Sequence, residues 1–198
     1  MNSNLACQED YSDPRREELH HGQVVMMAPS PNVNHNSIAF KIANIFANHL
    51  KNRRCKVFSD GTDVYLTEDD VFVPDMMVVC DRSKIKWNGV HGAPDLVVEV
   101  LSLGTAKRDR GYKKDVYEKS GVREYWIVSP KEKTVEVYLL EEGHFRLDGA
   151  YSLVPEEILR ELKEKDRKNI ISRFKCSLYD DLTIDLEDVF DDLLEDIY

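Results

Sequence analysis

The chain has 198 residues, 42% apolar residues and a formal net charge of −10, as is typical of one soluble domain, with or without an appendage, that buries a core. It has no run of about 18 apolar residues, and its first fifteen residues are polar and acidic rather than a signal-peptide pattern. We therefore expect a cytoplasmic protein without a membrane partner, folded as a single domain over residues 1–198.

The first quarter of the chain predicts two helices with a strand between them. Ser-Asp-Pro at 12–14 can cap and open a short helix. A turn at 20–23 then leads into a strand at 24–28. A second helix can open at 30–31, since the apolar residues at 38–50 recur with the helical period.

Strands dominate the next part. Alternating apolar residues predict strands at 56–66 and at 71–80, separated by the acidic turn 67–70. Residues 87–94 are predicted to be a loop. The apolar segment 93–102, APDLVVEVLS, follows as a buried strand.

The last half predicts helices that alternate with strands. In chain order the segments are a helix at 105–120 that ends at Gly121, strands at 122–130, 134–143 and 144–153, a charged helix at 155–170, and a strand and helix within 182–198. This order indicates an α/β domain with a mixed central sheet.

Charge is distributed unevenly. Nine acids and no Lys or Arg lie within residues 176–198, so this segment carries all but one of the net negative charges. We expect residues 1–12 to be a flexible N-terminus and residues 154–198 to be a variable helical and acidic extension that packs on the core. Two basic clusters, at 51–56 and 107–114, can be either solvated helix ends or contacts for phosphates.

The four cysteines, at positions 7, 55, 80 and 176, lie far apart and form no Cys-x-x-Cys pair. This spacing suggests neither a zinc cage nor a dense disulfide framework, so we expect reduced thiols.

Acidic residues within apolar strands indicate a site. Burying a carboxylate is costly unless it is paired, hydrogen-bonded or bound to a metal. Asp95 and Glu99 share one strand, but four residues of strand span about 13 Å, too far for both to bind one small cation. The other acid embedded in an apolar run is Asp75, so we pair Asp75 with Glu99.

Six segments together resemble the Uma-two-like restriction endonuclease family, a branch of the PD-(D/E)XK nuclease superfamily. They are HGQVVMMAPSPNVNH, VPDMMVV, APDLVVEVLS, RDRGYKKDVY, GVREYWIVSP and LTIDLEDVF. The resemblance runs from about Glu18 to Phe190 and is weakest between Val154 and Cys176. It implies a restriction-endonuclease-like fold, in which a mixed central β-sheet is flanked by helices.

The resemblance also implies roles for individual residues. Asp75 matches the Asp of "PD" and Glu99 the "(D/E)", and the backbone carbonyl of Val100 would complete the metal shell. The lysine expected two residues after the acid is Leu101 in this chain. The position in the following helix that matches the relocated lysine of related branches is Lys113.

Each further candidate also has an ordinary structural explanation. Lys113 can form a surface ion pair with Asp109, four residues earlier. Glu18 matches an acid that the family often has before its first hairpin, but a first-turn glutamate is equally expected. His35 is more often a packed core residue than a catalyst, and Asp95, which follows Pro94, more often serves a turn.

The resemblance implies an endonuclease that uses Mg²⁺, with Mn²⁺ as a substitute, to hydrolyse DNA, and that acts as a homodimer. Lys107, Arg108, Arg110 and Lys114 would contact the DNA, with Lys113 as the catalytic ammonium. The alternative is a non-catalytic interaction or nucleic-acid-binding domain that keeps the nuclease fold. Leu101 in place of lysine, Gln23 where the family often has an acid, and the net acidity favour that alternative.

Overall fold

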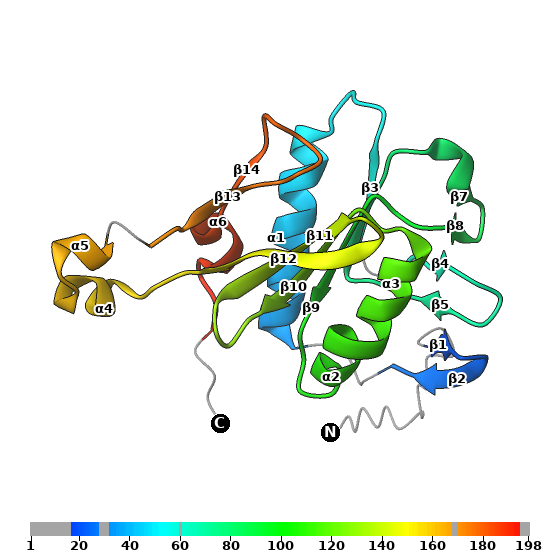
Figure 1. The fold of residues 1–198 in the computed structure, drawn as a ribbon, viewed down its shortest axis with the longest axis horizontal. Coiled ribbons are helices and arrows are strands. Elements are labelled where there is room, and N and C mark those ends of the chain that lie inside the picture. Colours follow the sequence, from blue (N-terminus) through cyan, green and yellow to red (C-terminus); the bar gives the residue numbers. More distant parts are fainter. Residues whose placement is uncertain (1–16, 28–31, 60, 168–169, 195–198) are drawn as a thin grey trace, which may run out of the picture.

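The computed structural model of the protein describes residues 17–27, 32–59, 61–167 and 170–194, and Figure 1 shows how its elements are arranged. The predicted N-terminal segment 1–12 and the predicted helix start at 12–14 lie outside the described residues. Within the described ranges, no helix is long and apolar enough to cross a membrane.

A six-stranded mixed sheet forms the centre of the fold, with the strand order β12-β11-β10-β9-β6-β3. Its β9 and β10 run parallel, whereas its other neighbouring strands are antiparallel. The parallel pair requires a crossover connection, which the helical segment between the two strands supplies. The strands are β3 (Lys56–Ser59), β6 (Met76–Val79), β9 (Leu96–Val100), β10 (Glu124–Ser129), β11 (Thr134–Glu141) and β12 (His144–Ser152).

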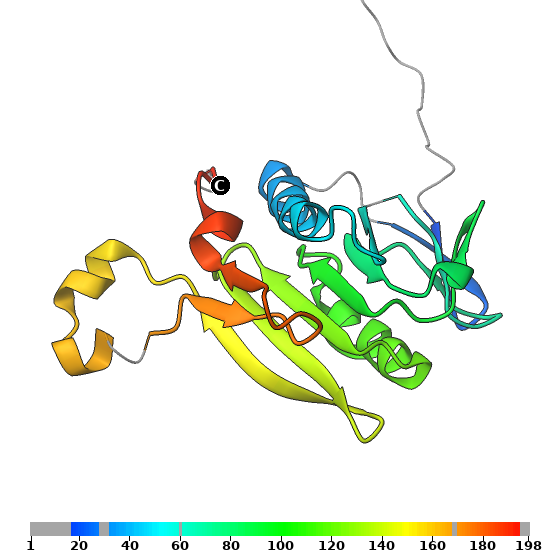
Figure 2. The same ribbon diagram turned by 90° about the horizontal axis from the view of Figure 1, so that it is seen from above.

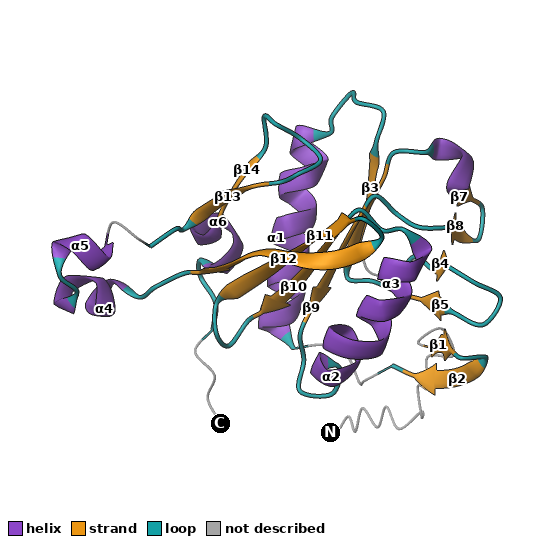
Figure 3. Ribbon diagram, viewed as in Figure 1, coloured by secondary structure: helices purple, strands orange, loops and turns teal. Residues whose placement is uncertain are grey.

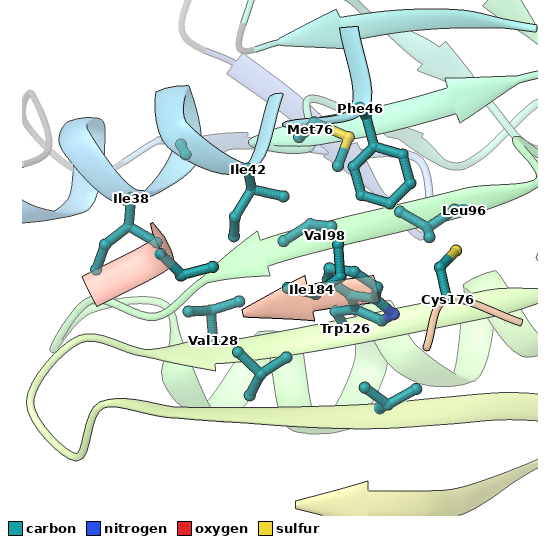
Figure 4. Close-up of a cluster of buried hydrophobic side chains, with 14 of the residues drawn as sticks. Ile38, Ile42, Phe46, Met76, Leu96, Val98, Trp126, Val128, Cys176 and Ile184 are labelled. Carbon is teal, nitrogen blue, oxygen red and sulfur yellow. The ribbon is translucent and has the colours of Figure 1, made fainter. Parts of the chain in front are cut away.

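One face of this sheet packs on α1 (Val33–His49), the long helix that the sequence predicts. Ile38, Ile42 and Phe46 recur every four residues along α1, are fully buried and point toward the sheet (Figure 4). The same core is completed by residues of the C-terminal elements β13 (Arg173–Lys175), β14 (Thr183–Asp185) and α6 (Leu186–Phe190). Figure 2 shows these elements, in orange and red, on the same side of the sheet as α1. The sheet is therefore covered on this side by segments from both ends of the chain.

The opposite face packs on a continuous helical segment made of α2 (Ala106–Arg108), η2 (Asp109–Lys113) and α3 (Lys114–Ser120). η2 is a single π-helical turn within this segment. α3 ends as predicted at Gly121, which has a φ of +88°, a conformation that glycine adopts without a steric penalty. Val116 and Tyr117 of α3 are buried in a second hydrophobic core, which lies between this helical segment and the sheet.

A smaller sheet borders this second core, with the order β2-β1-β5-β4-β8-β7. Phe72, Val64 and Val90 from its strands are fully buried. The strands are β1 (Glu17–His20), β2 (Gln23–Met26), β4 (Val64–Tyr65), β5 (Val71–Phe72), β7 (Ile85–Lys86) and β8 (Gly89–His91), with the 3-10 turn η1 (Arg82–Lys84) before β7.

Two short helices, α4 (Glu156–Glu161) and α5 (Glu164–Arg167), stand away from the central sheet (Figure 3). The prediction of one helix over 155–170 is therefore wrong, because Leu162 is extended and ends the first helix. A short helix gains most of its stability by packing an apolar face on a core, and without that packing it is not expected to continue.

Two other predictions of local structure are also wrong. Glu17–His20 is a strand rather than part of a helix, and its buried positions are the polar residues Glu18 and His20. Residues 17–20 therefore lack the alternating apolar side chains by which a strand is predicted from sequence. Residues 89–91, predicted as loop, form β8, in which Gly89 lies so close to the backbone of Asp63 that a side chain would not fit.

Cys55 and Cys80 form a disulfide, so the expectation of reduced thiols is wrong for this pair. The register of β3 and β6 pairs Lys56 with Val79, and the two cysteines are the next opposed residues. The strand register brings the thiols together although they are 25 residues apart in sequence.

Candidate active site

Asp75 and Glu99 come from neighbouring antiparallel strands. The register of β6 and β9 pairs Met76 with Val98. One further step along this ladder places Asp75 opposite Glu99, and directly opposed residues lie on the same face with Cβ atoms about 4.5–5.5 Å apart. Asp75 stands just before β6, where its Oδ2 accepts a hydrogen bond from the backbone N–H of Val100 at 2.7 Å.

Glu99 is buried on the side of the sheet that α3 covers, and only 4% of it is exposed. Its Oε1 lies 2.7 Å from Nζ of Lys113 and accepts a hydrogen bond from the Tyr117 hydroxyl at 2.8 Å. Both contacts fall on the same oxygen. No residue in the described part of the chain donates a hydrogen bond to Oε2 of Glu99, or to Oδ1 of Asp75.

Lys113 ends η2 and is buried, with 4% of the residue exposed. Its Nζ also lies 3.0 Å from Oε1 of Glu18 and 3.9 Å from Oδ1 of Asp109. The pair with Asp109 exists as the sequence allows, but both partners are buried rather than at the surface. π-helical turns within α-helices occur frequently at functional sites, and this one aims the lysine at Glu99.

Glu18 of β1 is the second buried acid on Lys113. Its Oε1 also accepts a hydrogen bond from the backbone N–H of Val73 at 2.9 Å, and its Oε2 lies 2.9 Å from Nε2 of His20. Burial acts to raise the pKa of Glu18, but the Lys113 ammonium and these hydrogen bonds outweigh it and hold the pKa at about 2. Glu18 is therefore a charged partner of the lysine.

His35, in the first turn of α1, reaches the site from the other side of the sheet. Its Nε2 lies 3.3 Å from Oδ2 of Asp75, and the residue is buried. Burial acts to lower the pKa of His35, but the neighbouring Asp75 carboxylate and the Val100 backbone outweigh it and hold the pKa above its usual value. Its Nδ1 has no hydrogen-bond partner among the described residues.

Asp95 lies apart from the other candidates. Its Oδ2 accepts a hydrogen bond from the backbone N–H of Cys80 at 2.7 Å, and its Oδ1 lies 3.5 Å from the exposed guanidinium of Arg123. These contacts connect the start of β9 with the end of β6. These contacts indicate a structural role for Asp95.

In the basic cluster at 107–114, some side chains are exposed to solvent and others contact neighbouring residues. Lys107 is exposed and Arg108 is half-buried. Arg110 pairs with Glu136 at 2.6 Å, and Nζ of Lys114 lies 3.7 Å above the ring of Tyr138.

A family model described as "Putative restriction endonuclease", Uma2, matches residues 5–165. The chain belongs to the Uma2 family.

Two further proteins are similar to this chain. An uncharacterized protein of Synechocystis sp. is 29% identical over 131 residues, which are 64% of this chain and 68% of that protein. A crystal structure from Anabaena variabilis, described as a "putative nuclease belonging to DUF820", has a TM-score of 0.63 and 22% identity and covers 88% of this chain and 89% of its own. The predicted family and the predicted mixed α/β fold class are therefore confirmed.

The charges in this Uma2 protein do not balance at the site. Glu18, Glu99 and Asp109 lie within 4 Å of one ammonium, that of Lys113, and Asp75 adds a further acid. Burial raises the pKa of Glu99 well above its usual value. Lys113 counteracts this, whereas Asp109 and Asp75 add to it. Burial alone would lower the pKa of Lys113, but Glu99, Glu18 and Asp109 raise it, so the lysine stays protonated.

This arrangement fits a divalent cation that takes few protein ligands. Mg²⁺ is usually bound by one or two carboxylates and keeps several waters, and Oδ1 of Asp75 and Oε2 of Glu99 are free to serve. Across the described ranges, no group of three or more His, Cys, Asp and Glu side chains could hold a metal ion. The two carboxylates therefore fit a metal with few protein ligands rather than a closed cage. The Val100 carbonyl as a third ligand, which the family resemblance implies, stays a prediction.

Two site residues were not found from the sequence. Tyr117, which donates to Glu99, is fully buried and reads as one more aromatic core residue of an amphipathic helix. The sequence indicates Asp109 only as a surface partner of Lys113, although it is 2% exposed. A hydrophobic pattern cannot predict that Asp109 and Lys113, two charged residues of one helical turn, are both buried.

Proposed function

We propose that this Uma2 protein is a magnesium-dependent endonuclease that hydrolyses the phosphodiester bonds of DNA. The observation that carries the proposal is the placement of Asp75 opposite Glu99, with the ammonium of Lys113 2.7 Å from the glutamate. Two carboxylates and an amine at one end of a strand pair suit phosphoryl transfer, because the reaction needs a cation and a donor near the developing negative charge.

Asp75, Glu99 and the backbone carbonyl of Val100 would hold the metal, and Mn²⁺ would substitute for Mg²⁺. A bound divalent cation lowers the pKa of a coordinated water and polarises the phosphate. The hydrogen bond from Val100 N–H holds one oxygen of Asp75 in place, which leaves the other free for the metal. Tyr117 does the same for Glu99.

Lys113 would orient the attacking water and stabilise negative charge on the phosphate in the transition state. Its three N–H donors can serve Glu18, Glu99 and one further acceptor. Because Glu18 and Glu99 hold the ammonium from two sides, the lysine is positioned before the substrate arrives.

The DNA would run past Lys107, Arg108, Arg110 and Lys114, next to Lys113 in the same helical segment. Lys107 is exposed, and Arg110 and Lys114 could exchange their present partners for phosphates. Phosphate contacts of this kind position the duplex without reading its sequence. A homodimer would present one site to each strand.

Plasmid nicking tests the proposal. Supercoiled DNA is incubated with the wild type and with Asp75→Asn, Glu99→Gln and Lys113→Ala, in MgCl₂, MnCl₂ or EDTA. We expect cleavage that needs the metal and falls at least about 100-fold in each variant. Asp95→Asn is the matched control and should retain cleavage. This acid lies on the same strand segment, but its side chain bonds to the Cys80 N–H and lies near Arg123 instead of the site.

A non-catalytic interaction domain is the second candidate, and one observation favours it. The Lys113 ammonium is already satisfied by Glu99 and Glu18, as it would be in a structural ion-pair network. If the wild type binds DNA but cuts neither DNA nor RNA with either metal, this second function is correct and the endonuclease proposal is wrong.

A further inference from the structure

A cavity of about 410 Å³ lies next to the candidate active site, at the carboxyl ends of the two parallel strands β9 and β10. Its wall includes Leu101 and Ser102, which follow β9, and the turn residues 130–133, which follow β10. In α/β sheets, ligands bind preferentially outside the carboxyl ends of the strands. The volume lies in the range of small-molecule pockets.

The charged residues of this wall favour an anion. The wall is lined by three basic residues, Arg110, Lys131 and Lys133, and by one acid, Glu132. Arg110 already pairs with Glu136. No carboxylate of the described residues forms an ion pair with Lys131 or Lys133, so two ammonium groups at this cavity are available to a ligand.

The first turn of α1 contributes to the same wall through Asn32 and Asn34. This helix has 17 residues and no acid in its first turn. Oδ1 of Asn32 already accepts a hydrogen bond from the His35 N–H, and the dipole at the helix N-terminus still favours a negative charge. The lysines and the helix therefore act in the same direction on whatever occupies the cavity.

Two residues that line the cavity are sequence neighbours of site residues. Leu101 directly follows Val100, and Asn34 directly precedes His35, whose Nε2 lies 3.3 Å from Asp75. One edge of the cavity is therefore formed by residues that adjoin the site residues in sequence, and we expect a phosphate next to one held at Asp75 to reach it. The apolar side chains of Leu101, Leu103 and Pro130 offer contacts for a sugar.

We propose that this cavity binds the sugar-phosphate backbone of the DNA strand that is cut, next to the scissile bond, with Lys131 and Lys133 as phosphate contacts. The inference rests on the proposed function and adds to it the path of one strand. These lysines lie in the β10–β11 turn, outside the basic cluster of the crossover helix, so the strand would be held from two sides of the site.

Binding in EDTA tests the inference without metal-dependent cleavage. The affinity for a fluorescein-labelled 16-base-pair DNA duplex is measured by fluorescence anisotropy between 50 and 200 mM KCl. The variants are Lys131→Ala/Lys133→Ala and the matched control Lys119→Ala/Lys175→Ala, which removes two exposed lysines away from the cavity. Circular dichroism checks that all three proteins are folded.

We expect the cavity variant to bind about tenfold more weakly at 100 mM KCl and to lose about two from the slope of log affinity against log salt, since each phosphate contact contributes about 0.9. The control should change neither quantity by as much. If the cavity variant matches the control, or if the wild type binds no DNA, the inference is wrong.

Plasmid nicking by the wild type separates this result from the proposed function. Cleavage by the wild type together with unchanged binding by the cavity variant would overturn only the inference. Weakened binding by the cavity variant, in a protein that never cuts DNA, would support the strand path and overturn only the endonuclease proposal.

Discussion

The ammonium of Lys113 lies 2.7 Å from Oε1 of Glu99, and both residues are about 95% buried. Such a pair is strongly coupled to its surroundings, since removing one partner leaves the other charge buried without compensation. Here the lysine also compensates Glu18. Lys113 therefore contributes to the stability of the fold as well as to the proposed chemistry.

Lys113→Ala should lower the free energy of unfolding by about 3–5 kcal/mol, because it leaves Glu18 and Glu99 without a cation. Urea denaturation followed by circular dichroism measures the change. Lys114→Ala is the matched control and should cost no more than about 1 kcal/mol, the value of a partly exposed cation–π contact with Tyr138. A loss below about 1 kcal/mol in Lys113→Ala would show that the buried network is not formed.

Tyr117→Phe should weaken Mg²⁺ binding about 10- to 100-fold, because residues that orient a metal-binding carboxylate typically contribute this much. The hydroxyl of Tyr117 donates to Glu99, whereas the equally buried hydroxyl of Tyr125 donates to the backbone carbonyl of Asp109. Calorimetric titration of both variants compares the two. Tyr125→Phe should bind Mg²⁺ as the wild type does, and equal losses in both variants would point to general damage of the core.

Glu18 should make the fold sensitive to acid. Its folded pKa of about 2 lies below the ordinary value of 4.5, so its stabilisation is fully present above pH 4.5 and is lost as the pH falls toward 2. The shift corresponds to about 3 kcal/mol.

Glu18→Gln should therefore be less stable than the wild type by about 3 kcal/mol at pH 7, and its stability should fall less between pH 4.5 and 2. Urea midpoints measured across this range test the expectation. Glu17→Gln changes an exposed glutamate of the same strand and should follow the wild type. Parallel curves for Glu18→Gln and the wild type below pH 4.5 would contradict the expected charge of Glu18.

The disulfide between Cys55 and Cys80 closes a loop of 25 residues that contains Asp75. Cross-linking a loop of this length should stabilise the protein by about 3 kcal/mol. Cys55→Ser/Cys80→Ser, or the wild type in a thiol reductant, should unfold at correspondingly lower urea. Thiol titration of the denatured, unreduced protein should find at most two of the four cysteines free, and four free thiols would show that the bond does not form.

The strand-bound acids could be predicted because each is a charged residue in an otherwise apolar run. Asp75 and Glu99 are conspicuous in VFVPDMMVVC and APDLVVEVLS. Their strands are neighbours although β7 and β8 lie between them in sequence, because those two strands belong to the smaller sheet. The α1 stripe was predictable for a similar reason, because Ile38, Ile42 and Phe46 recur at the helical period.

The rest of the site depends on tertiary contacts that leave no pattern in the sequence. Glu18 and His20 of β1 are buried by a neighbouring strand and helix and not by their own hydrophobicity. Tyr117 is both a core residue and a donor to Glu99, and only the second role is invisible in the sequence. The disulfide likewise follows from strand register, which a hydrophobic pattern predicts only approximately.

The most direct test of the account is a crystal of the protein soaked in MnCl₂ and measured for anomalous scattering. We predict one strong anomalous peak within about 2.5 Å of Oδ1 of Asp75, of Oε2 of Glu99 and of the Val100 carbonyl, lost in Glu99→Gln. A well-ordered crystal with no peak between the two acids, or with its peak elsewhere on the protein, would contradict the account.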